Sequence, residues 1–191
     1  MPVYRYQFSK PQITKEELLK ALERLGDLLK EQNILLELTV AGGIVSLLHF
    51  GSRNMTQDVD AIFPVDPEKN RLFKQLIIQV GNEQNLASFD SPWFNDAISF
   101  FGLETKSNVI VFRHSHLILK AASWEELLAH KLHAFRDSRD VDDATHLLES
   151  LSGKNKEQLF SSLKRYQPIA PHVPDKVFRQ RFDDIWERVF G

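Results

Sequence analysis

The order of strand-like and helix-like patterns limits the fold of this chain more than any other feature of the sequence. Apolar runs typical of buried strands lie mostly before residue 122, whereas every element predicted after Ser123 is a helix. Strands gathered early and helices gathered late are typical of an α+β fold. We therefore expect a mixed sheet with flanking helices at residues 1–122 and a C-terminal helical subdomain at residues 123–191.

Local signals predict where the individual elements begin and end. Capping boxes at residues 14–17 and 123–126 open helices that run to about residues 32 and 135. The stretch from 86 to 102 fits neither the helical nor the strand period. We expect strands at 36–40, 56–63, 109–112 and 117–119, and further helices at 44–50, 67–80, 140–151, 156–165 and 175–190.

Composition excludes several classes of protein. Hydrophobic residues make up 42% of the 191 residues, enough for a core, and 26% charged residues with a net charge of −2 argue against a disordered or generally basic chain. The absence of cysteine excludes disulfides and thiolate metal sites. The start of the chain has no signal-peptide core, and Glu37 and the Gly42-Gly43 pair interrupt the most apolar stretch. We expect a cytoplasmic protein without membrane contact.

Asp58 and Asp60 stand one residue apart in a predicted strand, so both carboxylates point to the same face. Two adjacent like charges are costly, and a divalent cation such as Mg²⁺ or Mn²⁺ removes that cost. The solvated face of an edge strand would give the same pattern. Asp140 and Asp142 repeat the spacing, but in a predicted helix.

Gly42 and Gly43 stand between a predicted strand and a short predicted helix. Without side chains, a backbone at this point can approach a phosphate closely, and the first N–H groups of a helix favour an anion. Most glycine pairs mark only a turn. The pair gains meaning from its place before the two aspartates.

In combination, these features resemble the nucleotidyltransferase superfamily that includes DNA polymerase β. The matching run begins at Val40-Ala41-Gly42-Gly43, continues through a short helix, and ends in the Asp-x-Asp strand of residues 56–63. A second segment, with Lys131 followed by Arg139-Asp140 and Asp143, is similar to bacterial nucleotidyltransferase-like proteins. These include the toxin halves of abortive-infection toxin–antitoxin pairs. The likeness covers roughly residues 36–151.

The resemblance implies transfer of a nucleoside monophosphate from a nucleoside triphosphate (NTP) to a hydroxyl acceptor, with release of pyrophosphate. It implies that Asp58 and Asp60 hold Mg²⁺ or Mn²⁺ and that Lys131 neutralises phosphate charge in the same cleft. The acceptor is left open between RNA, a protein side chain and a small molecule, and a cognate antitoxin is an expected partner. Six further residues are implied to contribute to substrate binding: Gly42, Gly43, Ser46, Thr56, Asp140 and Asp143.

Lys131 and the residues after it also have structural interpretations. Lys131 lies beside the apolar stripe of its helix, so its charge needs a nucleotide phosphate, a nearby aspartate or extension to solvent. Asp140 and Asp143 fit the N-cap and N3 positions of the next predicted helix. Arg136 and Arg139 fall near the end of the preceding helix, and we expect them to be solvated.

One departure from the family pattern concerns a third carboxylate, which active members commonly add on a strand beside the Asp-x-Asp strand. The predicted strand at 109–112 carries no acid, and the nearest upstream candidates are Asp96, our expected third metal ligand, and Glu104. A non-catalytic nucleotide- or protein-binding module on the same fold is therefore the alternative function. Histidine pairs at 114/116 and 130/133 offer a zinc alternative, but no His-Glu-x-x-His pattern supports it.

Overall fold

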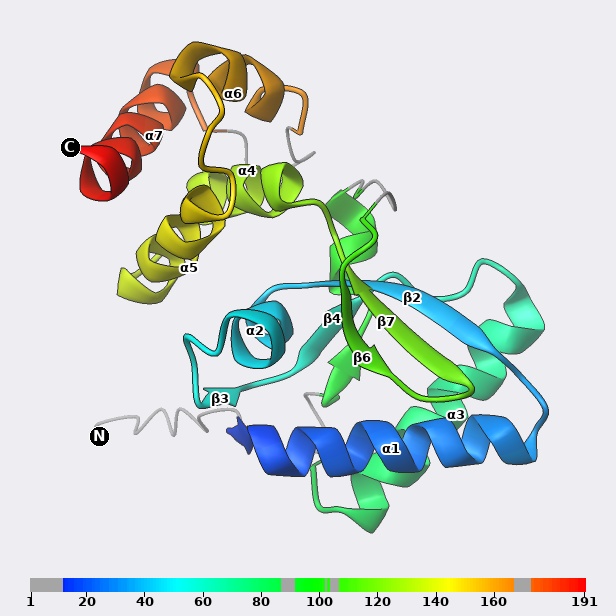
Figure 1. Ribbon diagram of the computed structural model, residues 1–191. Helices are drawn as coiled ribbons and strands as arrows, with labels where there is room; N and C mark the ends of the chain where they lie inside the picture. The colour runs from blue at the N-terminus through cyan, green and yellow to red at the C-terminus, as the bar shows by residue number, and fades with distance from the viewer. Residues whose placement is uncertain (1–11, 87–91, 102, 104–106, 167–172) are drawn as a thin grey trace, which may run out of the picture.

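A mixed five-stranded sheet forms the centre of the computed structural model, which describes residues 12–86, 92–101, 103, 107–166 and 173–191 (Figure 1). The strands lie in the order β5-β4-β2-β7-β6. β2 pairs in parallel with β7 and β4 with β5, whereas the other two pairs are antiparallel. Their bounds are Leu36–Ala41 (β2), Val59–Ala61 (β4), Phe94–Asn95 (β5), Ile110–Arg113 (β6) and Leu117–Ala121 (β7).

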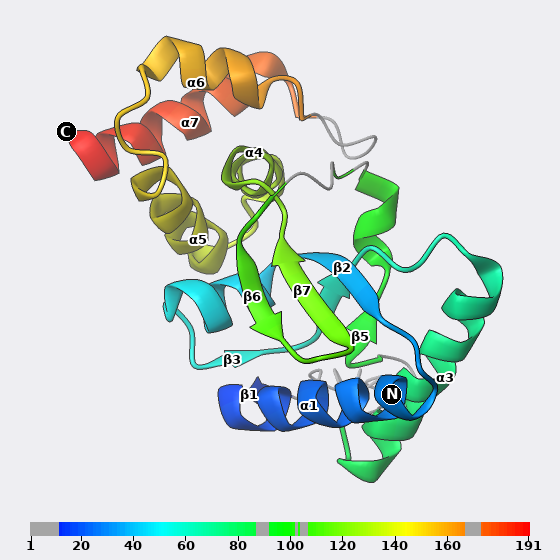
Figure 2. The same cartoon turned by 45° about the vertical axis from the view of Figure 1, so that its right-hand side comes forward.

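Two long helices, α1 (Lys15–Glu31) and α3 (Pro67–Glu83), lie on the same side of the sheet (Figures 1 and 2). The expected capping box of α1 is present, with Thr14 and Glu17 bonded to each other's backbone N–H groups. Asp66 caps α3 by accepting a hydrogen bond from Lys69 N at 2.8 Å. The apolar stripe of α1 is fully buried, as amphipathic packing against a sheet requires.

In the described part of the C-terminal region, residues 123–166 and 173–191, the chain forms four helices, which lie beyond one end of the sheet in Figure 1. Their bounds are Trp124–Ala134 (α4), Ser138–Glu149 (α5), Lys156–Leu163 (α6) and Asp175–Phe190 (α7). The expected division at residues 122/123 falls in the connection between β7 and α4. Buried apolar side chains nevertheless form one continuous cluster across it. The chain is thus an α+β protein with a mixed sheet, flanking helices and a C-terminal helical region.

The prediction of one continuous strand at 56–63 is wrong. Met55–Thr56 (β3) pairs with Ile13–Thr14 (β1) in a separate two-stranded ladder, and only residues 59–61 join the main sheet as β4. Between them the Thr56 hydroxyl donates to the Asp58 carbonyl at 3.0 Å, which bends the chain locally. Asp58 therefore precedes β4 instead of lying within it.

The short helix predicted at 44–50 is confirmed, but its winding changes midway. A single α-turn at Gly43–Val45 (α2) continues as a π-helical turn at Ser46–Phe50 (η1). Gly51 ends it in the left-handed conformation at φ 64°. None of the described helices combines the length and hydropathy that a membrane span requires.

His130, on α4, predicts a pH dependence of stability. Burial lowers the pKa of His130 to about 4, from an unfolded value of about 6.5. Between these values the unfolded chain binds a proton that the folded chain does not, so stability falls as the pH drops from 6.5 towards 4. We expect the free energy of unfolding to fall by about 2 kcal/mol between pH 7 and pH 5.

Urea unfolding at the two pH values measures this effect. His130→Gln, which cannot take up the proton, should lose most of the difference. Equal pH sensitivity in the variant and the wild type would contradict the assignment to His130.

Candidate functional site

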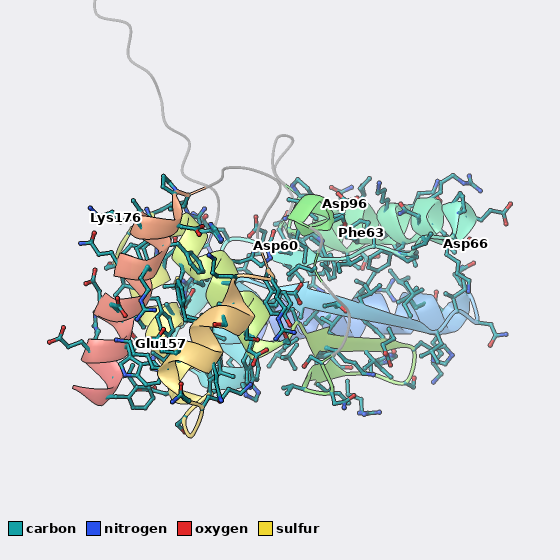
Figure 3. All side chains as sticks on the ribbon, turned by 90° about the horizontal axis from the view of Figure 1, so that it is seen from above. Asp60, Phe63, Asp66, Asp96, Glu157 and Lys176 are labelled. Atoms are coloured by element: carbon teal, nitrogen blue, oxygen red, sulfur yellow. The ribbon has the colours of Figure 1, made fainter. Side chains whose placement is uncertain are left out.

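A cleft of about 950 Å³ lies between the Gly42-Gly43 turn, the start of β4, the end of β5 and the first turn of α5. Asp60, which lines this cleft, is labelled in Figure 3 and lies where the sheet meets the C-terminal helices. All candidate residues from the sequence except Ser46 line this cleft. They are Gly42, Gly43, Thr56, Asp58, Asp60, Asp96, Lys131, Asp140 and Asp143.

The two glycines allow other groups to pack directly on the turn. Gly42 has φ 71° and ψ −145°, a conformation that residues with side chains rarely adopt. A Cβ atom there would lie 2.9 Å from Asp60 Oδ2, and one on Gly43 would clash with Thr56 Oγ1. The Asp60 carboxylate and the Thr56 hydroxyl therefore sit against bare backbone.

This packing predicts a specific cost for Gly42→Ala. The backbone strain costs about 1–3 kcal/mol, and the new methyl group also pushes on the Asp60 carboxylate. Gly51→Ala is the matched control, because Gly51 also has positive φ but no atom within 4 Å of its added Cβ. Urea unfolding should show the larger loss for Gly42→Ala, because Gly42 combines a ψ of −145° with the contact to Asp60, whereas Gly51 has a left-handed helical ψ of 16° and open space. Equal losses would contradict a specific cost at Gly42.

Asp58 and Asp60 share the cleft face, while Val59 and Ala61 are fully buried on the other side of the chain. Their carboxylates are hard oxygen donors of the kind that Mg²⁺ and Mn²⁺ prefer, so the pair fits such a cation. Within the described ranges, no group of three His, Asp or Glu side chains could hold a metal ion, zinc included.

β4 lies between β2 and β5, so the strand that follows β4 in the sequence and pairs with it is β5. The strand predicted at 109–112 forms β6, at the opposite edge of the sheet. Residues 109–112 therefore do not lie beside the Asp-x-Asp segment, and their lack of an acid has no bearing on a third carboxylate there. Asp96 directly follows β5 and lines the cleft, but its carboxylate lies 3.7 Å from Lys74 Nζ. Glu104 lies outside the described residues. Asp96 as a metal ligand stays a prediction.

Lys131 is held by two of the aspartates of α5, Asp140 and Asp143. Its Nζ lies 2.9 Å from Asp140 Oδ1 and 2.6 Å from Asp143 Oδ2, and both aspartates are almost fully buried. The sequence left three environments open for the Lys131 charge: a nucleotide phosphate, a nearby aspartate or solvent. In the structure, the charge pairs with aspartates. Lys131 still lines the same cleft as Asp58.

Asp143 joins the helical region to the sheet region. It accepts hydrogen bonds from Ser46 Oγ at 2.7 Å and from Arg53 Nε at 3.1 Å, as well as pairing with Lys131. Ser46 is 4% exposed and lies behind the turn, so it supports the cleft through Asp143 and does not line it. Three polar side chains from separate segments, Ser46, Arg53 and Lys131, therefore meet at one buried carboxylate.

The N-cap of α5 is Asp137, which accepts hydrogen bonds from Arg139 N and Asp140 N, so the predicted cap at Asp140 is wrong. Asp140 sits at N3 and accepts from Arg136 N and Nε, both at 3.0 Å. Burial opposes its ionisation, but the hydrogen bonds from Arg136 and Lys131 outweigh burial and hold the pKa of Asp140 well below its usual range.

Comparisons with protein-family models, curated proteins and solved structures found no match to this chain.

Three arginines that the sequence did not indicate as site residues also line the cleft: Arg53, Arg136 and Arg139. The side chains of Arg136 and Arg139 are 75% and 61% exposed, so the expected solvation is correct, yet both border the cleft. Arg53 stands in the loop after η1, where only its position next to the Gly51-Ser52 turn marks it in the sequence.

Proposed function

We propose that the cleft binds a nucleoside triphosphate with a divalent cation and transfers the nucleoside monophosphate to a hydroxyl acceptor, on a polymerase β-like nucleotidyltransferase fold. One observation carries this proposal. The glycine turn, the Asp58/Asp60 pair and Lys131, which are widely separated in the sequence, line a single cleft. Each suits a different part of a metal-bound triphosphate.

The glycine turn suits a phosphate group because its backbone is unshielded and opens a helix. Asp58 and Asp60 would hold Mg²⁺, which would supply positive charge against the negative charge that develops during transfer. Lys131, Arg53 and Arg136 add cationic groups around the same space.

Charge balance supports a dependence on metal. Aspartates outnumber Lys and Arg among the cleft-lining residues, and ion pairs already engage Lys131 and Arg53 with Asp143. A bare triphosphate would add further negative charge to this cleft. A bound divalent cation would cancel the two negative charges of the Asp58/Asp60 pair and so lower the repulsion of a triphosphate.

Calorimetry with ATP, GTP, CTP and UTP, in Mg²⁺ and in EDTA, tests the proposal. At least one nucleotide should bind in Mg²⁺ and bind much more weakly in EDTA. Equal affinity in the two conditions, or no binding at all, would reject the function. If a nucleotide binds, pyrophosphate release is measured with RNA, protein or small hydroxyl compounds to identify the acceptor.

A non-catalytic nucleotide-binding module is the second candidate. It is favoured by the residue opposite Asp60 on β5, which is Asn95 and not an acid. Such a module would bind nucleotide with Mg²⁺ but release no pyrophosphate with any acceptor.

A further inference from the structure

Asn95 lies directly beside Asp60 across the parallel β4–β5 pair. Residues paired in this way on neighbouring strands place their side chains on the same face of the sheet. Both Asn95 and Asp60 line the cleft, which agrees with that rule. The Asn95 amide is therefore part of the cleft floor next to the aspartate pair.

The short strand β5 is firmly anchored. Trp93 and Phe94 are each 1% exposed, and Trp93 Nε1 donates to the Ile77 carbonyl of α3 at 2.9 Å. Phe94 packs edge-on against Phe73, with ring centroids 5.4 Å apart. With Phe94 in the core, strand alternation directs Asn95 to the cleft.

The orientation of the Asn95 amide follows from one hydrogen bond. Its Oδ1 accepts from Ala97 N at 3.0 Å, and a backbone N–H can only donate, so the oxygen must face Ala97. The NH₂ group then faces the other way. It donates to no residue in the described part of the chain. Asn95 consequently offers a hydrogen-bond donor beside Asp60, where a carboxylate would offer only acceptors.

We propose that Asn95 is a substrate-contact residue whose amide NH₂ donates a hydrogen bond to a phosphate oxygen of the bound nucleotide. This inference rests on the proposed function, because that function places the phosphates beside Asp58 and Asp60. A donor at this point favours anionic oxygens. It cannot take a proton from the acceptor hydroxyl, so that proton must leave by another route.

Two substitutions separate the donor from the fold. Asn95→Asp keeps an oxygen for Ala97 N and so preserves that local hydrogen bond, but it replaces the donor with a carboxylate that repels phosphate. Because the new charge also lies beside Asp60, urea unfolding is measured in parallel to confirm that the variant is folded under the binding conditions. Asn95→Ala removes the donor without adding charge. Since a hydrogen bond to a charged group is strong, we expect the affinity for Mg²⁺-ATP to fall about tenfold in Asn95→Ala and further in Asn95→Asp.

Inorganic triphosphate with Mg²⁺ is the second probe, and it should lose affinity by the same factors as ATP, because the contact is to phosphate. Asn54→Asp is the matched control, since Asn54 lines the cleft away from β5. It should weaken binding less than Asn95→Asp does.

Three results would overturn the inference. The first is unchanged affinity of Asn95→Ala for both probes, and the second is an equal loss in Asn54→Asp and Asn95→Asp. The third is tighter Mn²⁺ binding by nucleotide-free Asn95→Asp with unchanged ATP affinity, which would make this position a metal-ligand position. Failure of the wild type to bind any NTP would instead reject the proposed function itself.

Discussion

Asp60→Asn should abolish the Mg²⁺-dependent part of nucleotide binding. The substitution keeps the size of the side chain that packs on the Gly42 backbone but removes the charge that attracts a cation. In the wild type we expect ATP to bind at least about a hundredfold more tightly in Mg²⁺ than in EDTA, a coupling of about 3 kcal/mol. In the variant the two affinities should be nearly equal. Asp58→Asn should behave in the same way, because both carboxylates face the cleft.

Glu37→Gln is the charge-matched control for both variants. Glu37 lies outside the cleft, on β2, where it pairs with Lys120 at 2.7 Å. Calorimetry should give Glu37→Gln the Mg²⁺ dependence of the wild type. A full Mg²⁺ effect in Asp60→Asn would remove Asp60 from the metal site and favour a cleft that binds nucleotide through its cations alone.

Elements with strong local signals were predictable from the sequence. The capping box at residues 14–17, the Asp66-Pro67 start of α3 and the Gly51 stop of η1 each depend on contacts within a few residues. Those contacts are the same in any fold, so the sequence alone identifies them.

Features set by distant pairing were not predictable. The break at Gln57 and Asp58 exists because β3 pairs with β1, about forty residues earlier in the chain. The place of β5 beside β4 depends on a parallel crossover through α3, and the stretch that contains β5 has no clear period. For this reason the sequence did not identify β5 as the strand that pairs with the Asp60 segment.

The same contrast between local and distant contacts applies to the residues of the candidate site. The glycine turn and the Asp58/Asp60 pair stand out because their spacing is local, whereas Lys131 was joined to them only through the family resemblance. Arg53 was missed because its partner, Asp143, is 90 residues away. The start of α5 was misplaced because Asp137 and Asp140 are equally good caps by sequence. Contacts with Lys131 and Arg136 place Asp140 one turn inside the helix.

Asp143→Asn should cause the largest loss of stability of any single substitution in the cleft. Asp143 is 3% exposed, and it balances Lys131 and Arg53, whose side chains are only 14% and 21% exposed. Without the carboxylate, Lys131 keeps its contact with Asp140, whereas Arg53 loses its acidic partner and keeps a hydrogen bond to the Arg139 carbonyl. Removal of one partner from a buried ion pair typically costs 3–5 kcal/mol, so we expect a loss of about 3 kcal/mol in urea unfolding.

Asp142→Asn is the control, with the same chemical change one residue earlier on the same helix. The Asp142 side chain is 57% exposed and pairs with Arg188 at 3.3 Å, so the loss should stay below about 1 kcal/mol. Similar losses in the two variants would mean that the charge of α5, and not the buried junction, determines stability. Ser46→Ala extends the test, because Ser46 donates to Asp143. Its cost in the wild type, about 1 kcal/mol, should shrink in the Asp143→Asn background if the carboxylate is the common partner that couples the two regions.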